Sequence, residues 1–189
     1  FKPGWIQYYD ELPKHYDKAV MSWDMTFKDT KTSDYVCGQV WVKEKSCYYL
    51  VDQIRGRFDF TTTLKKFIEF SNKHPYCKRK LIEDKANGTA VINTLKKHIS
   101  GIVPITPKES KVARASATST LWEAHNIYIP DKFKNRWVEL EYEDELLKFP
   151  GGLHDDQVDC TSQALNDLMS KQEHIDPTNV EAILRGFYG

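Results

Sequence analysis

The segment Ala19–Phe27 (AVMSWDMTF) is a run of apolar residues with Thr and Trp, which is typical of a β-strand. Two further strand-like segments follow it, Asp34–Lys43 (DYVCGQVWVK) and Cys47–Arg55 (CYYLVDQIR). A polar turn at residues 28–33 and a short turn at residues 44–46 separate the three segments. Because short connections favour antiparallel pairing, the sequence predicts a three-stranded antiparallel meander.

After the meander, the spacing of apolar residues lengthens to a helical period and alternates with short apolar runs. Helices are predicted at residues 61–73, 89–99, 108–124, 133–149, 155–169 and 180–184. Short strands are predicted at residues 78–84, 101–106 and 127–129. Parallel strands joined by crossover helices, added to an antiparallel meander, give an α/β fold with a mixed sheet and helices on both faces.

The composition fits one folded domain. The chain has 189 residues, of which 40% are hydrophobic, and this excludes an intrinsically disordered chain. The 27 basic and 27 acidic residues balance, whereas nucleic-acid binders usually carry a basic excess. Any nucleic-acid binding must therefore depend on local clusters, and basic residues gather at positions 77–85 and 108–114.

The four cysteines, Cys37, Cys47, Cys77 and Cys160, form no CxxC pair, so we expect free thiols rather than a zinc site. The sequence contains no apolar run of membrane-spanning length and no visible signal peptide. It begins at Phe1 rather than Met, so we expect an excised domain. Residues 1–18 are expected to be a lead-in arm or linker, and residues 19–189 the domain itself.

A set of acidic residues indicates a metal site: Asp24, Glu83, Asp84, Asp155, Asp156 and Asp159. A carboxylate inside an apolar strand, as at Asp24, is costly to bury unless it is paired or binds metal. If the first and fourth strands are neighbours, Asp24 and Asp84 meet at one edge of the sheet, and the first turn of the late helix joins them. Such carboxylates can hold two divalent ions about 4 Å apart, and their hard oxygens suit magnesium or manganese.

The same residues have simpler interpretations. Asp155 and Asp156 can be helix N-caps that interact favourably with the helix dipole. Asp24 can pair with a buried lysine, and Glu83 and Asp84 can form a solvated strand end. Spacing alone leaves these alternatives open.

Several longer motifs carry a resemblance to a known family. They are Trp23–Lys28 (WDMTFK), Ser33–Val36 (SDYV), Leu50–Arg57 (LVDQIRGR), Leu81–Gly88 (LIEDKANG) and Phe149–Asp159 (FPGGLHDDQVD). Together they resemble the C-terminal nuclease domain of the large terminase subunit of tailed bacteriophages, over about residues 19–170. The resemblance implies a ribonuclease-H-like fold, which is a mixed sheet of the kind predicted above.

The resemblance also implies a function: metal-dependent endonuclease cleavage of concatemeric double-stranded viral DNA, with two Mg²⁺ or Mn²⁺ ions as cofactors. In the family an N-terminal ATPase domain completes the protein, and the sequence has no Walker A pattern of its own. The implied partners are DNA, that ATPase domain, the portal and the small terminase subunit, with no membrane. The implied place of action is the host cytoplasm, at the procapsid.

By the family pattern, Asp24, Asp84 and Asp156 are the expected catalytic metal ligands, with Asp155 and Asp159 as alternatives for the third position. Accessory roles are expected for Glu83, Lys85 and His154. Contacts to DNA phosphates are expected from Lys108, Lys111, Arg114, Arg55 and Arg57. Each of these basic side chains can instead be a solvated surface charge, and Arg55 and Arg57 can simply lie at the end of a strand.

Two other functions remain open from the sequence. One is a nuclease of the same superfamily, resembling a Holliday-junction resolvase or a transposase. The other is a DNA-gripping or motor-docking module without catalytic activity. The continuous match around LIEDKANG and PGGLHDDQVD favours the terminase nuclease.

Overall fold

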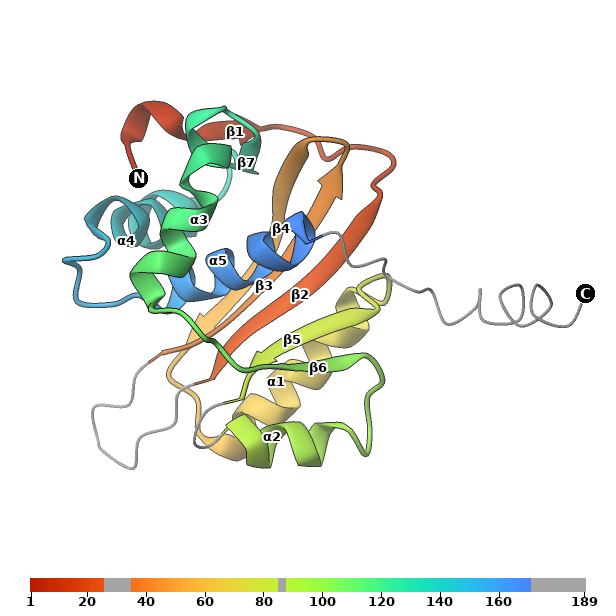
Figure 1. The fold of residues 1–189 in the computed structure, drawn as a ribbon. Coiled ribbons are helices and arrows are strands. Elements are labelled where there is room, and N and C mark those ends of the chain that lie inside the picture. The colour runs from red at the N-terminus through yellow and green to blue at the C-terminus, as the bar shows by residue number, and fades with distance from the viewer. Residues whose placement is uncertain (26–34, 85–87, 171–189) are drawn as a thin grey trace, which may run out of the picture.

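The computed structural model describes residues 1–25, 35–84 and 88–170. Its centre is a seven-stranded sheet in the order β1-β7-β4-β3-β2-β5-β6 (Figure 1). The strands are β1 Gln7–Tyr9, β2 Lys18–Met25, β3 Val36–Glu44, β4 Cys47–Gly56, β5 Arg79–Glu83, β6 Ile102–Ile105 and β7 Ile127–Pro130.

The mixed sheet predicted from the sequence is confirmed. Strands β2, β3 and β4 form the antiparallel meander. Strand β5 pairs with β2 in parallel, and β6 pairs with β5 in parallel. On the other side of the meander, β7 runs parallel to β4.

Residues 1–18 include a strand that we did not expect. Gln7–Tyr9 pair in parallel with β7 and form the outer strand β1. Ile6 is buried, and the ring of Phe1 packs edge-on against Trp122 at 5.6 Å. At three residues, β1 is too short for side-chain alternation to reveal it. Part of the expected linker therefore packs against the domain, while its role as a link to another domain stays a prediction.

The helices are η1 Pro3–Trp5, α1 Phe60–Lys73, α2 Gly88–Leu95, α3 Lys111–Glu123, η2 Val138–Tyr142, α4 Glu143–Lys148 and α5 Asp156–Met169. We expected one helix over residues 133–149. Its first residues instead form a turn, because the Asp131 side chain accepts hydrogen bonds from the backbone N–H of Phe133 and Lys134. The helix expected at 180–184 lies outside the described residues. None of the helices in the described ranges is both long and apolar enough to cross a membrane.

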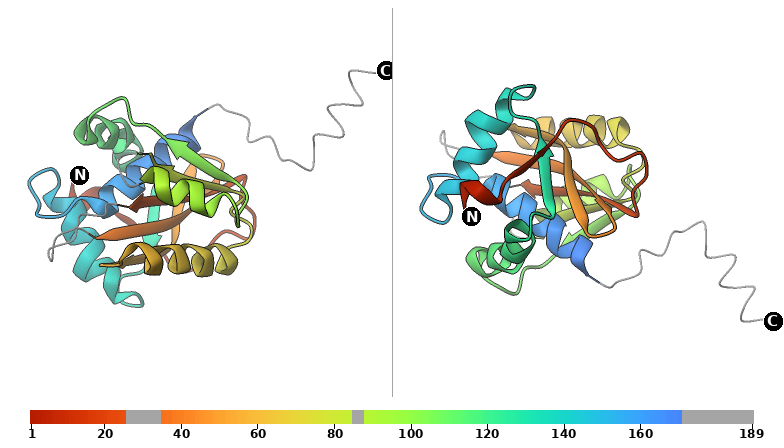
Figure 2. Two further views of the ribbon diagram at one scale, coloured as in Figure 1. Left: turned by 90° about the horizontal axis from the view of Figure 1, so that it is seen from below. Right: turned by 90° about the horizontal axis from the view of Figure 1, so that it is seen from above.

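Helices cover both faces of the sheet, as Figures 1 and 2 show. Helices α1 and α2 pack on one face over a core cluster that includes Met21, Trp23, Phe67, Ile82 and Val91. Helices α3, α4 and α5 pack on the other face, over a cluster that includes Val20, Leu50, Leu81, Trp122 and Leu165.

Alternation along β2 decides which face Asp24 occupies. Met21 and Trp23 point toward α1, so Ser22 and Asp24 point toward α5. The Ser22 hydroxyl donates to the backbone oxygen of Cys160 in α5 at 2.8 Å, and the backbone N–H of Asp24 lies 3.1 Å from the Cys160 sulfur. Helix α5 therefore crosses the sheet at close range directly over Asp24.

The close packing of Trp23 predicts that Gly38→Ala destabilises the domain. A Cβ atom at Gly38 would lie 2.7 Å from the Trp23 indole, which is fully buried and held by Phe67 and Phe70. The free energy of unfolding, measured by urea denaturation, is expected to fall by about 1–3 kcal/mol. Gly4→Ala, with open space around it, is the control, and equal stabilities of the two variants would contradict this packing argument.

Candidate active site

Acidic side chains from three elements meet at one edge of the sheet. Because β2 and β5 are parallel, their carboxyl ends lie together, and Trp23 pairs with Ile82 in their ladder. Asp24 and Glu83 come one position later on each strand, so they share the face that α5 covers. Helix α5 begins at the same edge and brings Asp156 and Asp159, both largely buried, in its first turn. We call Asp24, Glu83, Asp156 and Asp159 the acidic cluster.

The pKa of Asp24 shows how strongly these carboxylates influence one another. Removal from water is the largest effect, and the neighbouring carboxylate of Asp159 comes next. Glu83 and Asp156 add smaller contributions, while Lys111 opposes them. Together these effects raise the pKa of Asp24 to about 8. The negative charges of the acidic cluster are therefore close enough to raise the energy of the ionised form.

Asp84 does not belong to this group, and the expectation that it lies beside Asp24 is corrected. Alternation turns Asp84 to the opposite face from Glu83, and the Asp84 carboxylate accepts a hydrogen bond from the Thr89 hydroxyl at the start of α2. The sequence motif contains two adjacent acidic residues, and only the register of β5 decides which one faces Asp24.

Lys111 is bound to the acidic cluster. Helix α3 starts just before it, where the Ser110 hydroxyl accepts from the backbone N–H of Ala113 at 3.2 Å. From the first turn, Lys111 Nζ lies 2.6 Å from Asp159 Oδ2 and 2.8 Å from Asp155 Oδ1. Asp155 is half-exposed and makes no side-chain cap to α5. We expected Lys111 on a surface that grips DNA, and the structure places it inside the site.

Arg114 lies one turn further along α3 and bridges two members of the acidic cluster. Its Nη2 is 2.9 Å from Asp159 Oδ1 and 3.5 Å from Glu83 Oε2. The side chain is only 10% exposed, so Arg114 is not a solvated surface charge.

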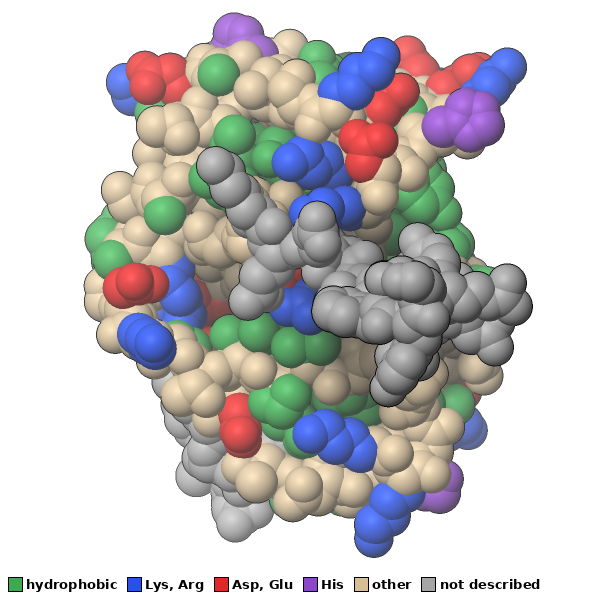
Figure 3. Space-filling model, turned by 45° about the vertical axis from the view of Figure 1, so that its right-hand side comes forward, with side chains coloured by type: hydrophobic (Ala, Val, Ile, Leu, Met, Phe, Trp, Pro, Cys, Tyr) green, Lys and Arg blue, Asp and Glu red, His purple; other side chains and the backbone are tan. Residues whose placement is uncertain are grey.

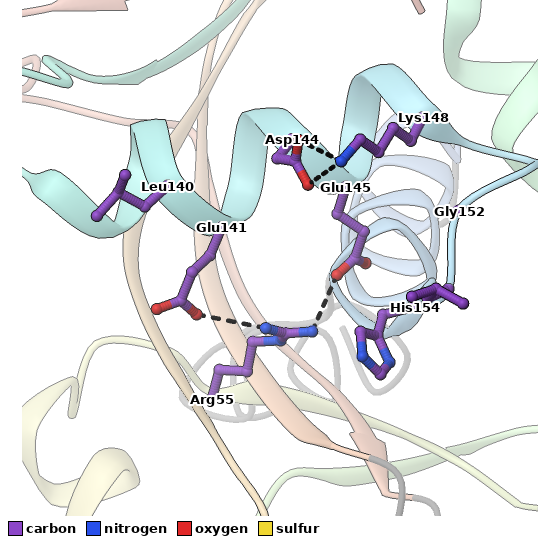
Figure 4. A pocket seen from close by; sticks show the side chains of 9 residues that line it. Arg55, Leu140, Glu141, Asp144, Glu145, Lys148, Gly152 and His154 are labelled. Carbon is purple, nitrogen blue, oxygen red and sulfur yellow. Dashed lines mark hydrogen bonds and ion pairs between the residues drawn. The ribbon is translucent and has the colours of Figure 1, made fainter.

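Arg55, on β4, binds Asp156 of the acidic cluster. Its Nε donates to Asp156 Oδ2 at 2.6 Å, and its Nη2 donates to Asp156 Oδ1 at 3.2 Å. The same guanidinium contacts Glu141 and Glu145, as Figure 4 shows, and lies 3.8 Å from the centre of the Tyr35 ring. Arg55 was a candidate DNA contact, but its donors are used within the protein.

Glu145 has a role that we did not predict. Its Oε1 accepts from the backbone N–H of Gln157 at 2.6 Å and of Val158 at 3.1 Å, so it caps the first turn of α5 from α4. It also pairs with Arg55 at 3.2 Å. A cap supplied by another helix leaves no local sequence pattern, because only residues next to a helix start carry that information. Glu145 fixes where α5 begins, and with it the position of Asp156 and Asp159.

The other predicted residues lie around the site. The His154 ring packs edge-on against Tyr35 at 5.0 Å, and Arg57 lies 4.8 Å from the centre of the same ring. Lys108 is exposed in the loop between β6 and α3. Lys85 lies outside the described residues.

The donors of the acidic cluster suit a hard divalent cation. All are carboxylate oxygens, the ligands that magnesium and manganese prefer. Among the residues that the structure describes, no three His, Cys, Asp or Glu side chains are grouped as a ready coordination shell. Instead Arg55 binds Asp156, Lys111 binds Asp159, and Arg114 binds both Glu83 and Asp159. The acidic cluster can therefore bind a metal ion if its carboxylates release these basic side chains when the metal binds.

The raised pKa of Asp24 predicts that the metal-free domain loses stability as the pH rises. The folded state keeps a proton on Asp24 up to about pH 8, whereas the unfolded state releases it near the ordinary value of 3.8. Between these values the folded state binds more protons, so the free energy of unfolding falls by up to about 1.4 kcal/mol per pH unit. Asp24→Asn is expected to remove this contribution and to be more stable than the wild type at about pH 8 in EDTA. Urea unfolding at several pH values measures the difference, and parallel curves for the two proteins would contradict it.

Comparisons with known proteins agree with this architecture. The family model described as the terminase ribonuclease-H-like domain matches residues 21–168. A search of curated proteins gave no match. Among solved structures, the large terminase nuclease of thermophilic phage G20c with bound zinc is similar, with a TM-score of 0.64, 17% identity and coverage of 86% of this chain and 94% of that one.

Two further solved structures have the same fold. The large terminase nuclease domain of bacteriophage SPP1 with bound manganese has a TM-score of 0.62 and 18% identity, over 87% of this chain and 97% of that one. The large terminase of a second thermophilic bacteriophage has a TM-score of 0.62 and 17% identity, and the match covers 87% of this chain but only 43% of that longer chain. With the family model matched over most of its length, the chain belongs to the terminase ribonuclease-H-like domain family.

Proposed function

We propose that this chain is the metal-dependent nuclease domain of a viral genome-packaging motor and that it cuts concatemeric double-stranded DNA. The observation that carries this proposal is the meeting of Asp24, Glu83 and Asp159 at one sheet edge, in a domain of the terminase family. Three carboxylates from two parallel strands and one helix provide the oxygen ligands that phosphodiester hydrolysis by divalent metal requires.

We assign the metal ligands to Asp24, Glu83 and Asp159. Asp159 is the carboxylate with the largest effect on Asp24. Asp156, which the sequence favoured as the third ligand, has both oxygens bound to Arg55. Asp156 is therefore better placed to hold the start of α5 than to release an oxygen to metal.

Two Mg²⁺ or Mn²⁺ ions are the proposed cofactors. Divalent ions at such a site supply an activated water and stabilise the leaving oxygen of a phosphodiester. The solved nuclease structures of phage SPP1 and phage G20c hold manganese and magnesium respectively, which supports this choice. In this chain Lys111 and Arg114 stand beside the carboxylates, where they offset the charge of the DNA phosphate.

The proposed setting is a larger protein with an ATPase domain. The similar large terminase of the second thermophilic phage is more than twice as long as the matched region, and that protein was also solved with ADP. We propose that DNA and such an ATPase domain are the direct partners, with the portal and the small terminase subunit as further ones. The place of action would be the procapsid in the host cytoplasm.

Cleavage of supercoiled plasmid in manganese, magnesium or EDTA tests the proposal. Asp24→Asn, Glu83→Gln and Asp159→Asn are each expected to lower the cleavage rate at least about 100-fold, because each removes a ligand. Asp84→Asn is the matched control, since Asp84 faces away from the cluster, and it should cut like the wild type.

Loss of cleavage in Asp84→Asn with retained cleavage in Glu83→Gln would reverse the ligand assignment. A folded wild type that cuts in neither metal would favour a DNA-gripping module. Strong preference for four-way junctions over linear duplex would favour a resolvase-like nuclease.

Lys111→Gln is expected to raise the affinity for Mn²⁺, measured by calorimetry without DNA. The Lys111 ammonium lies 2.6 Å from Asp159 Oδ2, so a metal ion that binds Asp159 has to displace Lys111. Without that competitor the affinity should rise several-fold, up to about tenfold, which equals about 1.4 kcal/mol. Lys108→Gln removes an exposed lysine three residues earlier and should leave Mn²⁺ binding unchanged. Equal or weaker Mn²⁺ binding by Lys111→Gln would show that Lys111 does not compete with metal.

A further inference from the structure

A hollow of about 340 Å³ lies next to the acidic cluster, between α5 and the loop that joins β6 to α3. Its walls include Lys108 and Pro107 from the loop, Arg114 from α3, and Gln163 and Asn166 from α5. Arg114 belongs to both places, since it lines the hollow and also binds Glu83 and Asp159. The hollow thus shares one side chain, Arg114, with the proposed catalytic site.

Arg114 has donors that the protein does not use. Only Nη2 takes part in its ion pairs, while Nε and Nη1 are buried and have no hydrogen-bond partner among the described residues. A guanidinium always carries its charge. Leaving a buried donor unpaired costs about 1–3 kcal/mol, and more when the group is charged. Such a pair of unused charged donors beside a hollow indicates a place for an anion.

The surroundings of the hollow also favour an anion. Lys108 is exposed at its rim, and the side-chain amides of Gln163 and Asn166 lie in its wall. The first turn of α3 begins at Ser110 beside the hollow, and the N-terminus of a helix favours negative charge.

Two carboxylates in the wall of the hollow, Asp167 and Glu109, disfavour the binding of an anion. Asp167 is neutralised by Arg79 at 2.7 Å, and Glu109 is an exposed residue of the loop. Figure 3 shows basic and acidic side chains interspersed over one face of the molecule, without a broad basic field in that view. A DNA strand would therefore be held by a few well-placed cations rather than by general attraction.

We propose that this hollow is a subsite for a backbone phosphate of the DNA strand, next to the phosphate that is cut. The inference rests on the proposed nuclease function. The planar fork of a guanidinium matches two phosphate oxygens, which a lysine cannot do. If Glu83 and Asp159 bound metal instead of Arg114, the Arg114 guanidinium would be free to rotate into the hollow. Arg114 then links metal loading to the grip on the strand.

The test measures binding of a fluorescent DNA duplex by anisotropy in calcium, over a range of salt concentrations, with gels to show that the duplex stays intact. Lys108→Gln is expected to lower the slope of log affinity against log salt by about one, the value for one lost phosphate contact. Arg114→Lys keeps the charge but loses the fork, and it is expected to weaken binding by about fivefold to tenfold. Lys65→Gln, on α1 across the sheet, is the control and should match the wild type.

Wild-type affinity and salt slope in both Lys108→Gln and Arg114→Lys would overturn the subsite. Weaker DNA binding by Arg114→Lys together with an equal loss of Mn²⁺ affinity would also overturn it, because Arg114 would then act only on the metal ligands. If the wild type cuts plasmid in manganese while the variants bind DNA normally, only the subsite fails. If the wild type neither binds nor cuts DNA, the proposed function fails and the subsite with it.

Discussion

The parallel pairing of β2 with β5, under a closely packed α5, is the constraint on which the site depends. Parallel neighbours end at the same edge of a sheet, and the pairing of Trp23 with Ile82 makes Asp24 and Glu83 adjacent on one face. The hydrogen bond from Ser22 to the backbone of Cys160 brings α5 close enough for Asp159 to join them. On the opposite face, the buried Trp23 ring fills the space above Gly38 and so fixes which side chains of β2 point to each face. The core therefore determines which acidic residues meet.

Gathering carboxylates in this way opposes folding, and the structure shows how the cost is offset. Burial raises the pKa of both Asp24 and Asp159, and neighbouring carboxylates raise the pKa of Asp24 further. Positive charge is supplied beside these carboxylates by Arg55, Lys111 and Arg114. Buried ion pairs of this kind seldom add net stability, since desolvation of both partners offsets their attraction. Hydrophobic contacts would have been the better choice for stability alone, so the charged arrangement agrees with the proposed exchange of these basic side chains for metal.

The sequence predicted the fold more completely than the site. The meander, the parallel strands and most helices follow from side-chain periodicity, which is a local property. The choice between Glu83 and Asp84 depends on strand register, because a shift of one residue turns each side chain to the other face. The two basic residues of α3, Lys111 and Arg114, were expected to contact DNA phosphates, since their acidic partners lie elsewhere in the chain and helical spacing does not show them. Glu145 was missed for the same reason: it caps a helix that starts eleven residues later.

The two aspartates in the first turn of α5 illustrate how partners, rather than residue type, separate roles. Asp156 is held by two bonds from Arg55, whose strand lies within the sheet and whose guanidinium is also fixed by Glu145. Asp159 is held by Lys111 and Arg114, both from the first turns of α3, and Arg114 also lines an open hollow. The two hydrogen bonds from Arg55, whose guanidinium Glu141 and Glu145 also hold, are harder to exchange than the contacts of Asp159 with a half-exposed lysine and one nitrogen of Arg114. In the proposed function the first aspartate anchors the helix, and the second passes its oxygens to metal while the released cations turn toward phosphate.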